Sequence, residues 1–114
     1  FTVRFRWNVM YMLNVQIVRF VDSSFPGWVE CVLKDSSNRE WLFIDKIPVF
    51  TDQNLHEMSH YPQQGVIACE IIRTWVEFDG RKRCIITTEI PWGIAAQDGK
   101  TEFEVFYDQL RFEK

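Results

Sequence analysis

The chain has 114 residues, of which 46% are hydrophobic and 25% charged, and its net charge is −3. This length supports one hydrophobic core and predicts a single domain over residues 1–114. The acidic balance argues against a general nucleic-acid-binding protein, which gains affinity by neutralising phosphates, and the lack of a long apolar run predicts no transmembrane helix.

Three strands are predicted in the first half of the chain. Residues 1–11 carry Arg4 and Arg6 but no acid, and we interpret them as an N-terminal extension or an added edge strand. Hydrophobic alternation then predicts strands over residues 13–21, 28–34 and 40–47. The residues expected on the core face of the first two are Leu13, Val15, Ile17, Val21, Val29, Cys31 and Leu33.

One short helix is predicted after the third strand. Residues 51–65 contain few β-branched residues, and Thr51 or Asp52 is suited to cap a helix. Tyr61-Pro62 must end this helix, because the residue before a proline avoids the helical region. We therefore expect about two helical turns near residues 52–60.

A long hairpin is predicted next. Two strand-like runs, residues 65–78 and 81–90, are joined by an Asp-Gly pair that is typical of two-residue hairpin turns. Counting outward from such a turn places Glu70 opposite Glu89, which predicts a solvated pair, a β-bulge that separates the two carboxylates, or an acid–base dyad. The expected core face carries Ile67, Cys69, Ile71, Trp75, Cys84, Ile86 and Ile90.

A C-terminal strand over residues 101–110 completes the predicted elements. We therefore expect a mostly β fold, either a small antiparallel barrel or a curled sheet, with one short helix. The element order β-β-β-α-β-β, followed by the C-terminal strand, resembles that of an OB-type barrel. The resemblance concerns element order only, and a curled sheet with another winding would give the same pattern.

The stretch HEMSH, residues 56–60, fits the H-E-x-x-H pattern of zinc peptidases. In that chemistry two histidines one helical turn apart bind Zn²⁺, and the glutamate acts as general base on the metal-bound water. Here Tyr61-Pro62 follows at once, and no second helix supplies a third ligand. We interpret the stretch as a polar helix that closes one end of a barrel. Metal binding by His56 and His60 is the alternative.

A basic cluster marks one candidate binding surface. Arg81, Lys82 and Arg83 follow the predicted turn, and Arg73 lies nearby on the preceding strand. Basic residues interleaved with aromatic residues such as Trp75 are typical of sheets that bind single-stranded nucleic acid. A charged hairpin tip that only adds solubility is the other interpretation.

Three tryptophans mark a second candidate surface. Trp28, Trp41 and Trp92 stand beside turns or on strand faces of mixed polarity. Exposed tryptophan is typical of contact surfaces, although large rings also plug the ends of barrels.

The three cysteines, Cys31, Cys69 and Cys84, are widely spaced and lie within apolar runs. This pattern predicts buried free thiols and favours a cytoplasmic location, because it does not form a disulfide framework. The sequence also has no Gly-rich phosphate loop and no G-x-S-x-G motif, which leaves nucleophilic catalysis without a basis.

These observations predict a small non-enzymatic binding module that needs no cofactor. Its partner is expected to be another protein, or a second copy that pairs through an exposed edge strand. An immunity-like protein, an inhibitor or an accessory subunit would fit this description. Two alternatives remain: an OB-type module for single-stranded nucleic acid, and a minimal zinc hydrolase that uses His56, Glu57 and His60.

Overall fold

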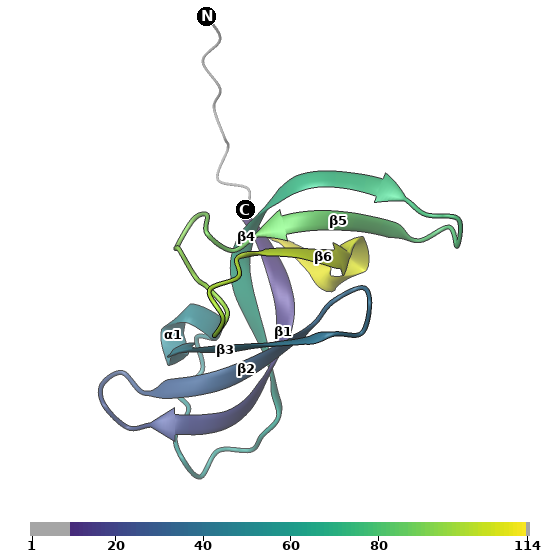
Figure 1. Ribbon diagram of the computed structural model, residues 1–114. Coiled ribbons are helices and arrows are strands. Elements are labelled where there is room, and N and C mark those ends of the chain that lie inside the picture. Colours follow the sequence, from purple (N-terminus) through teal and green to yellow (C-terminus); the bar gives the residue numbers. More distant parts are fainter. Residues whose placement is uncertain (1–9, 114) are drawn as a thin grey trace, which may run out of the picture.

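A computed structural model describes residues 10–113, which form a curled antiparallel sheet in the shape of a half-barrel (Figure 1). The predicted mostly β fold with one short helix is thereby confirmed. Residues 1–9 of the predicted extension lie outside the described residues, whereas Met10 and Tyr11 begin the first strand. The strands are β1 (Met10–Asp22), β2 (Trp28–Lys34), β3 (Glu40–Lys46), β4 (Gln63–Val76), β5 (Lys82–Thr87), β6 (Glu102–Phe106) and β7 (Leu110–Glu113).

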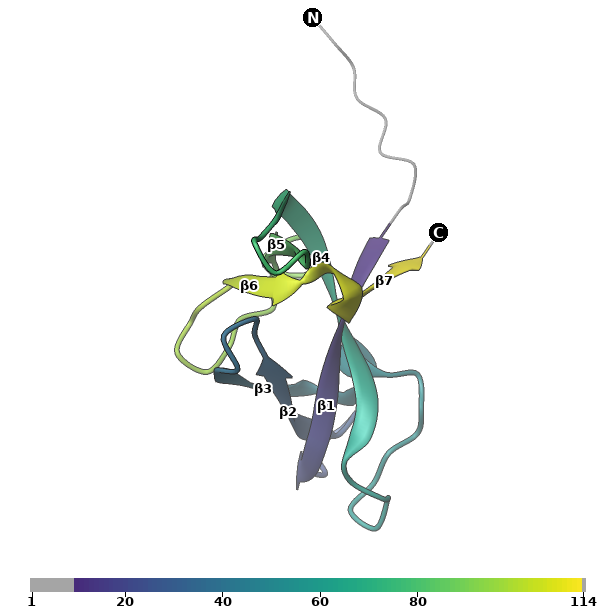
Figure 2. The same cartoon turned by 90° about the vertical axis from the view of Figure 1, so that its right-hand side faces the viewer.

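The sheet follows the order β3-β2-β1-β4-β5-β6, with β7 beside β1, and all of the strand pairs within residues 10–113 are antiparallel. The two long strands, β1 and β4, allow the curl because each pairs with different neighbours along its length. One side of β1 pairs with β4, while its other side pairs first with β7 and then with β2. Figure 2 shows β7 beside the start of β1.

The core forms where the alternating apolar residues meet inside the curl. Leu13, Val15 and Ile17 are buried as predicted, and so are the three predicted residues of β2. Val21 is 38% exposed, so its predicted place in the core is wrong. Two register shifts in the β1–β2 pair, after Ile17 and after Phe20, break the alternation, and Phe20 packs against the core instead.

The predicted position of the helix is wrong. Residues 52–60 form turns and irregular loop, and the helix α1 spans Ile47–Phe50, directly after β3. Pro48 in the first turn suits this position, because proline there loses no intrahelical hydrogen bond. Ile47 and Phe50 are buried, and the Ile47 amide donates to the Gly27 carbonyl at 2.9 Å. Burial of these two side chains therefore outweighs the capping residues that favoured a helix further along.

The predicted register of the long hairpin is also wrong. The Glu77 amide donates to the Arg81 carbonyl and the Gly80 amide to the Glu77 carbonyl, so the loop has three residues and Gly80 takes a positive φ. A further bulge follows Ile71. Glu70 therefore lies opposite Thr87, and the predicted pairing with Glu89 does not occur.

These shifts also change which residues of the hairpin reach the core. Ile67, Cys69, Cys84 and Ile86 are buried as predicted, and Ile71 packs against the core. Trp75 lies opposite Arg83, on the other face from Cys84, and Ile90 is exposed after the end of β5. Trp75 and Ile90 were thus wrongly assigned to the core face.

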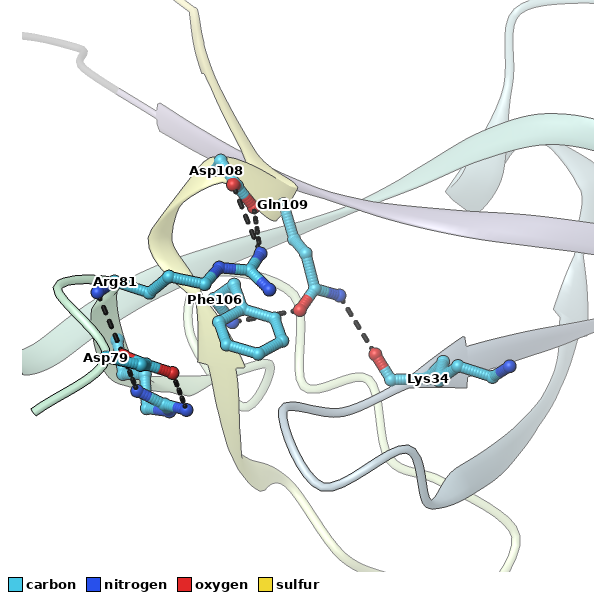
Figure 3. Close-up of polar contacts among 7 residues, drawn as sticks. Lys34, Asp79, Arg81, Phe106, Asp108 and Gln109 are labelled. Atoms are coloured by element: carbon cyan, nitrogen blue, oxygen red, sulfur yellow. Dashed lines mark hydrogen bonds and ion pairs between the residues drawn. The ribbon is translucent and has the colours of Figure 1, made fainter. Parts of the chain in front are cut away.

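The C-terminal segment is not one strand but three elements. β6 ends at Phe106, the 3₁₀ helix η1 spans Tyr107–Gln109, and β7 then joins β1. The Gln109 side chain fixes this bend: its amide oxygen accepts from the Phe106 amide at 2.9 Å, and its nitrogen donates to the Lys34 carbonyl at 2.9 Å (Figure 3).

Candidate functional site

The HEMSH stretch does not have the geometry that zinc peptidase chemistry requires. The His56 ring accepts the Met58 amide at Nδ1, 3.2 Å away, and the Tyr61 hydroxyl donates to the His56 carbonyl at 2.7 Å. These local hydrogen bonds hold a turn, not a helix, so His56 and His60 do not lie one helical turn apart. Residues 10–113 contain no group of three His, Cys, Asp or Glu side chains that could hold a metal ion. The predicted helical basis of the hydrolase alternative is thus wrong.

The basic cluster lies on an arm of the molecule, which we define as residues 70–87 together with β6 and η1. Its cations lie over aromatic rings of the same chain. The Arg81 guanidinium lies 3.4 Å from the centre of the Phe106 ring, and that of Arg83 lies 4.9 Å from it. The Lys82 ammonium lies 4.0 Å above Tyr107. These cations cover faces of the Phe106 and Tyr107 rings on which a nucleic-acid base could otherwise stack, whereas the ring of Phe78 at the hairpin tip is fully exposed.

Carboxylates pair with two of these cations, Arg81 and Arg83. Arg83 makes two hydrogen bonds to Asp79, at 2.9 and 3.1 Å, and this contact lowers the pKa of the Asp79 carboxyl to about 2. Arg81 pairs with Asp108 at 3.3 Å (Figure 3). The Arg83 guanidinium also lies 3.9 Å from Glu104. The structure thus brings Arg81, Lys82 and Arg83 together, with both arginines paired to carboxylates and Lys82 in contact with the Tyr107 ring.

The fourth predicted cation, Arg73, lies apart from this network. Its guanidinium lies 4.5 Å from the centre of the Trp75 ring, on β4. Trp75 is directly opposite Arg83 on β5, and Arg83 is directly opposite Phe106 on β6. The outer face of the arm therefore alternates between cation and ring across three strands.

The three predicted tryptophans have different roles. Trp41 is half-buried: its indole nitrogen donates to Asp35 at 2.9 Å, and its ring packs edge-on against Phe103 at 5.6 Å. Arg39 and Lys100 lie over the same ring. Trp41 is therefore part of the seam between β3 and β6, and it is not available as a free binding surface.

Trp28 and Trp92, by contrast, lie near α1: Trp92 lines a cavity with Pro48 and Val49, and Trp28 is opposite Lys46, which precedes α1. The α1 helix lies at the end of the molecule opposite the β4–β5 hairpin (Figure 1). Trp92 belongs to the loop between β5 and β6 and is 52% exposed. Trp28 lies opposite Lys46, whose ammonium is 5.7 Å from the ring. We call the residues Trp28, Lys46, Pro48, Val49 and Trp92 the α1 surface.

Two cavities adjoin the α1 surface, and both are lined by Pro48, Val49 and Trp92. The first, of about 430 Å³, also reaches Met12 and Val66 and carries Asp52 and Arg111 as its charged residues. The second, of about 480 Å³, carries Asp45 and Lys46. Trp92 therefore lies between the two cavities. Each cavity is lined mainly by apolar residues and has one acidic and one basic residue.

A buried hydroxyl positions the loop that bears Trp92. Thr88 is fully buried, and its side chain donates to the Ile94 carbonyl at 2.5 Å. Its amide donates to the Thr101 carbonyl, and the Ile94 amide donates back to the Thr88 carbonyl. These bonds close the loop on both sides of Trp92. This anchor could not be predicted from the sequence, because a lone threonine after a strand has no distinctive pattern.

The cysteines take no part in either surface. All three are buried and free, as the sequence predicted. Burial raises the pKa of Cys69 to about 12 and that of Cys84 to about 11, and it raises the pKa of Cys31 further. At neutral pH these thiols are protonated, so they are poor nucleophiles.

Comparison with protein-family models, with curated proteins and with solved structures finds no match to this chain. Within residues 10–113, no helix has the length and hydropathy needed to cross a membrane.

Proposed function

We propose that this protein is a non-enzymatic, cytoplasmic binding module whose α1 surface contacts a partner protein. The observation that carries the proposal is the half-exposed indole of Trp92 between two cavities. Among the described residues, no cation or aromatic ring lies over Trp92, in contrast to Trp75, Phe106 and Tyr107 of the arm. Its face is free to contact a ligand.

Leaving such a large apolar ring in water costs free energy, and contact with a partner removes that cost. Tryptophan contributes more binding energy than most residues at protein interfaces, especially where it adjoins pockets that a partner can fill. Alternate side chains of an extended segment lie roughly 7 Å apart on one face. We propose that apolar side chains of such a segment enter the cavities beside Trp92. An immunity-like protein, an inhibitor or an accessory subunit would act in this way.

Affinity capture from the source organism tests the proposal. We expect one stoichiometric protein to co-purify with the wild-type chain, and Trp92→Ala to weaken that complex at least about 30-fold, as for an interface hot spot. Phe78→Ala is the matched control, because Phe78 is equally apolar and fully exposed but lies at the hairpin tip. Equal binding by wild type and Trp92→Ala, or equal loss in both variants, would refute the assignment of the surface.

A second candidate function rests on the winding of the sheet. The path β3-β2-β1-β4-β5, with α1 between β3 and β4, supports an OB-type arrangement, in which the β2–β3 face and the β1–β2 and β4–β5 loops bind single-stranded ligands. Phe25 and Phe78 are the exposed rings of these two loops. A cavity of about 550 Å³ beside β2 contains Lys34 and Glu40.

Filter binding separates the two functions. A single-strand-binding module would retain oligonucleotides with an affinity that falls as salt rises, and Phe25→Ala would weaken retention while Trp92→Ala would not. No retention at low salt would remove this candidate. We favour the protein-binding function, because Arg81 and Arg83 of the β4–β5 hairpin are already paired with carboxylates.

A further inference from the structure

The first cavity beside the α1 surface has the size of a small-ligand site. Its volume of about 430 Å³ lies within the range of roughly 300–1,000 Å³ that is typical of small-molecule sites, near the lower end. Residues of β1, β4 and β7 line it, together with α1, Asp52 in the loop that follows α1, and Trp92. The cavity therefore suits a ligand of about a dozen non-hydrogen atoms.

Strand pairing places a cation beside apolar residues in this cavity. Arg111 on β7 lies directly opposite Met12 on β1, and opposed residues of antiparallel strands point to the same face. Their face is the outer one, because Leu13, the neighbour of Met12, is buried in the core. Val66 of β4 lines the same cavity. The guanidinium of Arg111 is thus next to an apolar hollow.

The two charged residues of the cavity lack partners within the described part of the chain. Asp52 and Arg111 are both exposed and line the same cavity, yet they do not form an ion pair with each other. Neither makes a side-chain hydrogen bond or a ring contact within residues 10–113. Arg81 and Arg83 of the arm, by contrast, are paired with carboxylates. A free carboxylate and a free guanidinium therefore face whatever fills the cavity.

Gln64 supplies a third polar group, and its orientation is fixed. Its amide nitrogen donates to the side-chain oxygen of Asn14 at 3.0 Å and to the carbonyl of Gly65 at 2.9 Å. Among the described residues, no donor reaches its Oε1 atom. The cavity thus offers two acceptors, the Asp52 carboxylate and Gln64 Oε1, and the donors of one guanidinium.

We propose that this cavity binds a free α-amino acid with an apolar side chain. The carboxylate of the ligand pairs with Arg111, whose planar guanidinium matches a carboxylate. Its ammonium group donates to Asp52 and to Gln64 Oε1, and its side chain lies against Val49 and Trp92. Every polar group that the cavity leaves free then has a partner.

The pair of opposite charges selects this class of ligand over others. The interior of a peptide has neither terminal charge, and a fatty acid has only the carboxylate. Either ligand would cover the cavity and leave Asp52 without a partner, which costs free energy once water is displaced. A zwitterion satisfies both Asp52 and Arg111.

This inference goes beyond the proposed function and does not require a partner protein. The amino acid occupies one of the two cavities that we propose for the side chains of the partner. It therefore competes with the partner for the α1 surface.

Isothermal titration calorimetry with L-phenylalanine tests the ligand class. We expect a dissociation constant on the order of 0.1 to 1 mM, as for a ligand of this size. Phenylalanine amide lacks the carboxylate and N-acetylphenylalanine lacks the ammonium group, so each should bind at least about tenfold more weakly. No binding of L-phenylalanine at millimolar concentrations, or equal binding of either derivative, would overturn the proposal.

Two substitutions test the assigned contacts. Arg111→Gln should weaken binding of L-phenylalanine at least about tenfold and remove the difference between phenylalanine and its amide, and Asp52→Asn should remove the difference between phenylalanine and its N-acetyl form. Both residues are exposed, so both variants should fold. Arg39→Gln and Glu57→Gln are the matched controls, because these residues are exposed and do not line the cavity. Effects no larger than those of the controls would refute the assignment.

NMR spectra of the ¹⁵N-labelled chain locate the site. L-phenylalanine should shift the amide signals of Gly65 and Val66 and the indole signal of Trp92, which all belong to the cavity lining. Shifts confined to the cavity beside β2, at Gln16 and Val32, would overturn the proposal. A chain that binds no amino acid but captures its partner through Trp92 would refute this inference alone. Amino-acid binding without Trp92-dependent capture would refute only the proposed function.

Discussion

At one end of this molecule the indole of Trp92 stands half-exposed between two cavities, and at the other end the ring of Phe106 lies beneath two guanidinium groups. Both ends are rich in aromatic residues and both have basic residues nearby. The two ends differ in whether groups of the same chain cover the aromatic ring. In the arm the chain supplies the cations, the rings and the carboxylates that pair with them. On the α1 surface, by contrast, the ring of Trp92 and the two cavities beside it are uncovered.

This contrast shows why aromatic and basic residues in a sequence do not by themselves define a binding site. A ring that stacks on an arginine of its own chain stabilises the fold, and a ring beside an empty cavity is available to a ligand. The four changes below test that distinction, from the largest expected loss of stability to the smallest.

Phe106→Ala should have the largest effect, because it removes the ring that supports both Arg81 and Arg83. We expect a loss of about 2 to 3 kcal/mol in the free energy of unfolding, less than for a fully buried phenylalanine. Urea denaturation measures it. Phe106→Leu is the control: it keeps most of the apolar volume but has no aromatic face, so equal stability of Leu and wild type would show that the cation–ring contacts contribute nothing.

Gly65→Ala should be next, and it acts beneath the α1 surface. A Cβ at position 65 would lie 2.8 Å from Ile17 Cγ1 and 3.3 Å from the Phe50 carbonyl oxygen. We expect a loss of about 2 kcal/mol from overpacking, measured by thermal or urea unfolding. Adding Ile17→Val, which removes the Cδ1 atom 2.9 Å from that Cβ, should restore part of the loss. If it does not, the strain lies at the Cγ1 position, which valine keeps, or at the Phe50 carbonyl.

Asp79→Asn tests the ion pair of the arm through its pH dependence. Contact with Arg83 lowers the pKa of Asp79 to about 2 in the folded chain, so the carboxylate stabilises the fold above its ordinary pKa near 3.8 and this contribution is lost as pH falls toward 2. Wild type should therefore be more stable than Asp79→Asn at pH 6, and the difference should shrink between pH 4 and pH 2. The asparagine still offers an oxygen to the Arg81 amide, which keeps the turn. A pH-independent difference would contradict this account.

Trp92→Ala should have the smallest effect on folding. Because the indole is half-exposed and makes no aromatic or cation contact among the described residues, we expect a change below about 1 kcal/mol in thermal or urea unfolding. This variant distinguishes the α1 surface from the arm most clearly, because it should retain the fold and lose partner binding. A loss as large as that of Phe106→Ala would show that Trp92 plugs the end of the barrel and does not serve as a contact residue.

Local pattern predicted some residues well and others poorly. The alternation of β2 correctly placed Val29, Cys31 and Leu33 in the core, because that strand has no break in its pairing with β3. The same reasoning failed for Trp75, because a three-residue loop and a bulge each shift the count along the hairpin. Side-chain alternation has a period of two, so one extra residue reverses the predicted face.

The candidate sites show the same limit. Trp92 was identifiable from the sequence as a ring beside a turn, but the hollows around it are formed by α1, β1, β4 and β7, which come together only in the folded chain. The cluster from Arg81 to Arg83 was also identifiable. Its neutralisation was not, since the Arg81 partner Asp108 is 27 residues away and is placed by the bend at Gln109.

The sequence by itself determined the class of the fold, the strand-rich order of its elements and the burial of its cysteines, because these depend on alternation and composition within short windows. Only the tertiary structure decided where the helix forms, which cations are already paired, and which tryptophan remains uncovered. Each of those outcomes depends on contacts between distant segments: Gly27 with Ile47, Arg81 with Asp108, and the Trp92 loop with α1. Short sequence windows do not predict such contacts. The HEMSH stretch is an example, because its histidines have helical spacing and yet it folds as a turn.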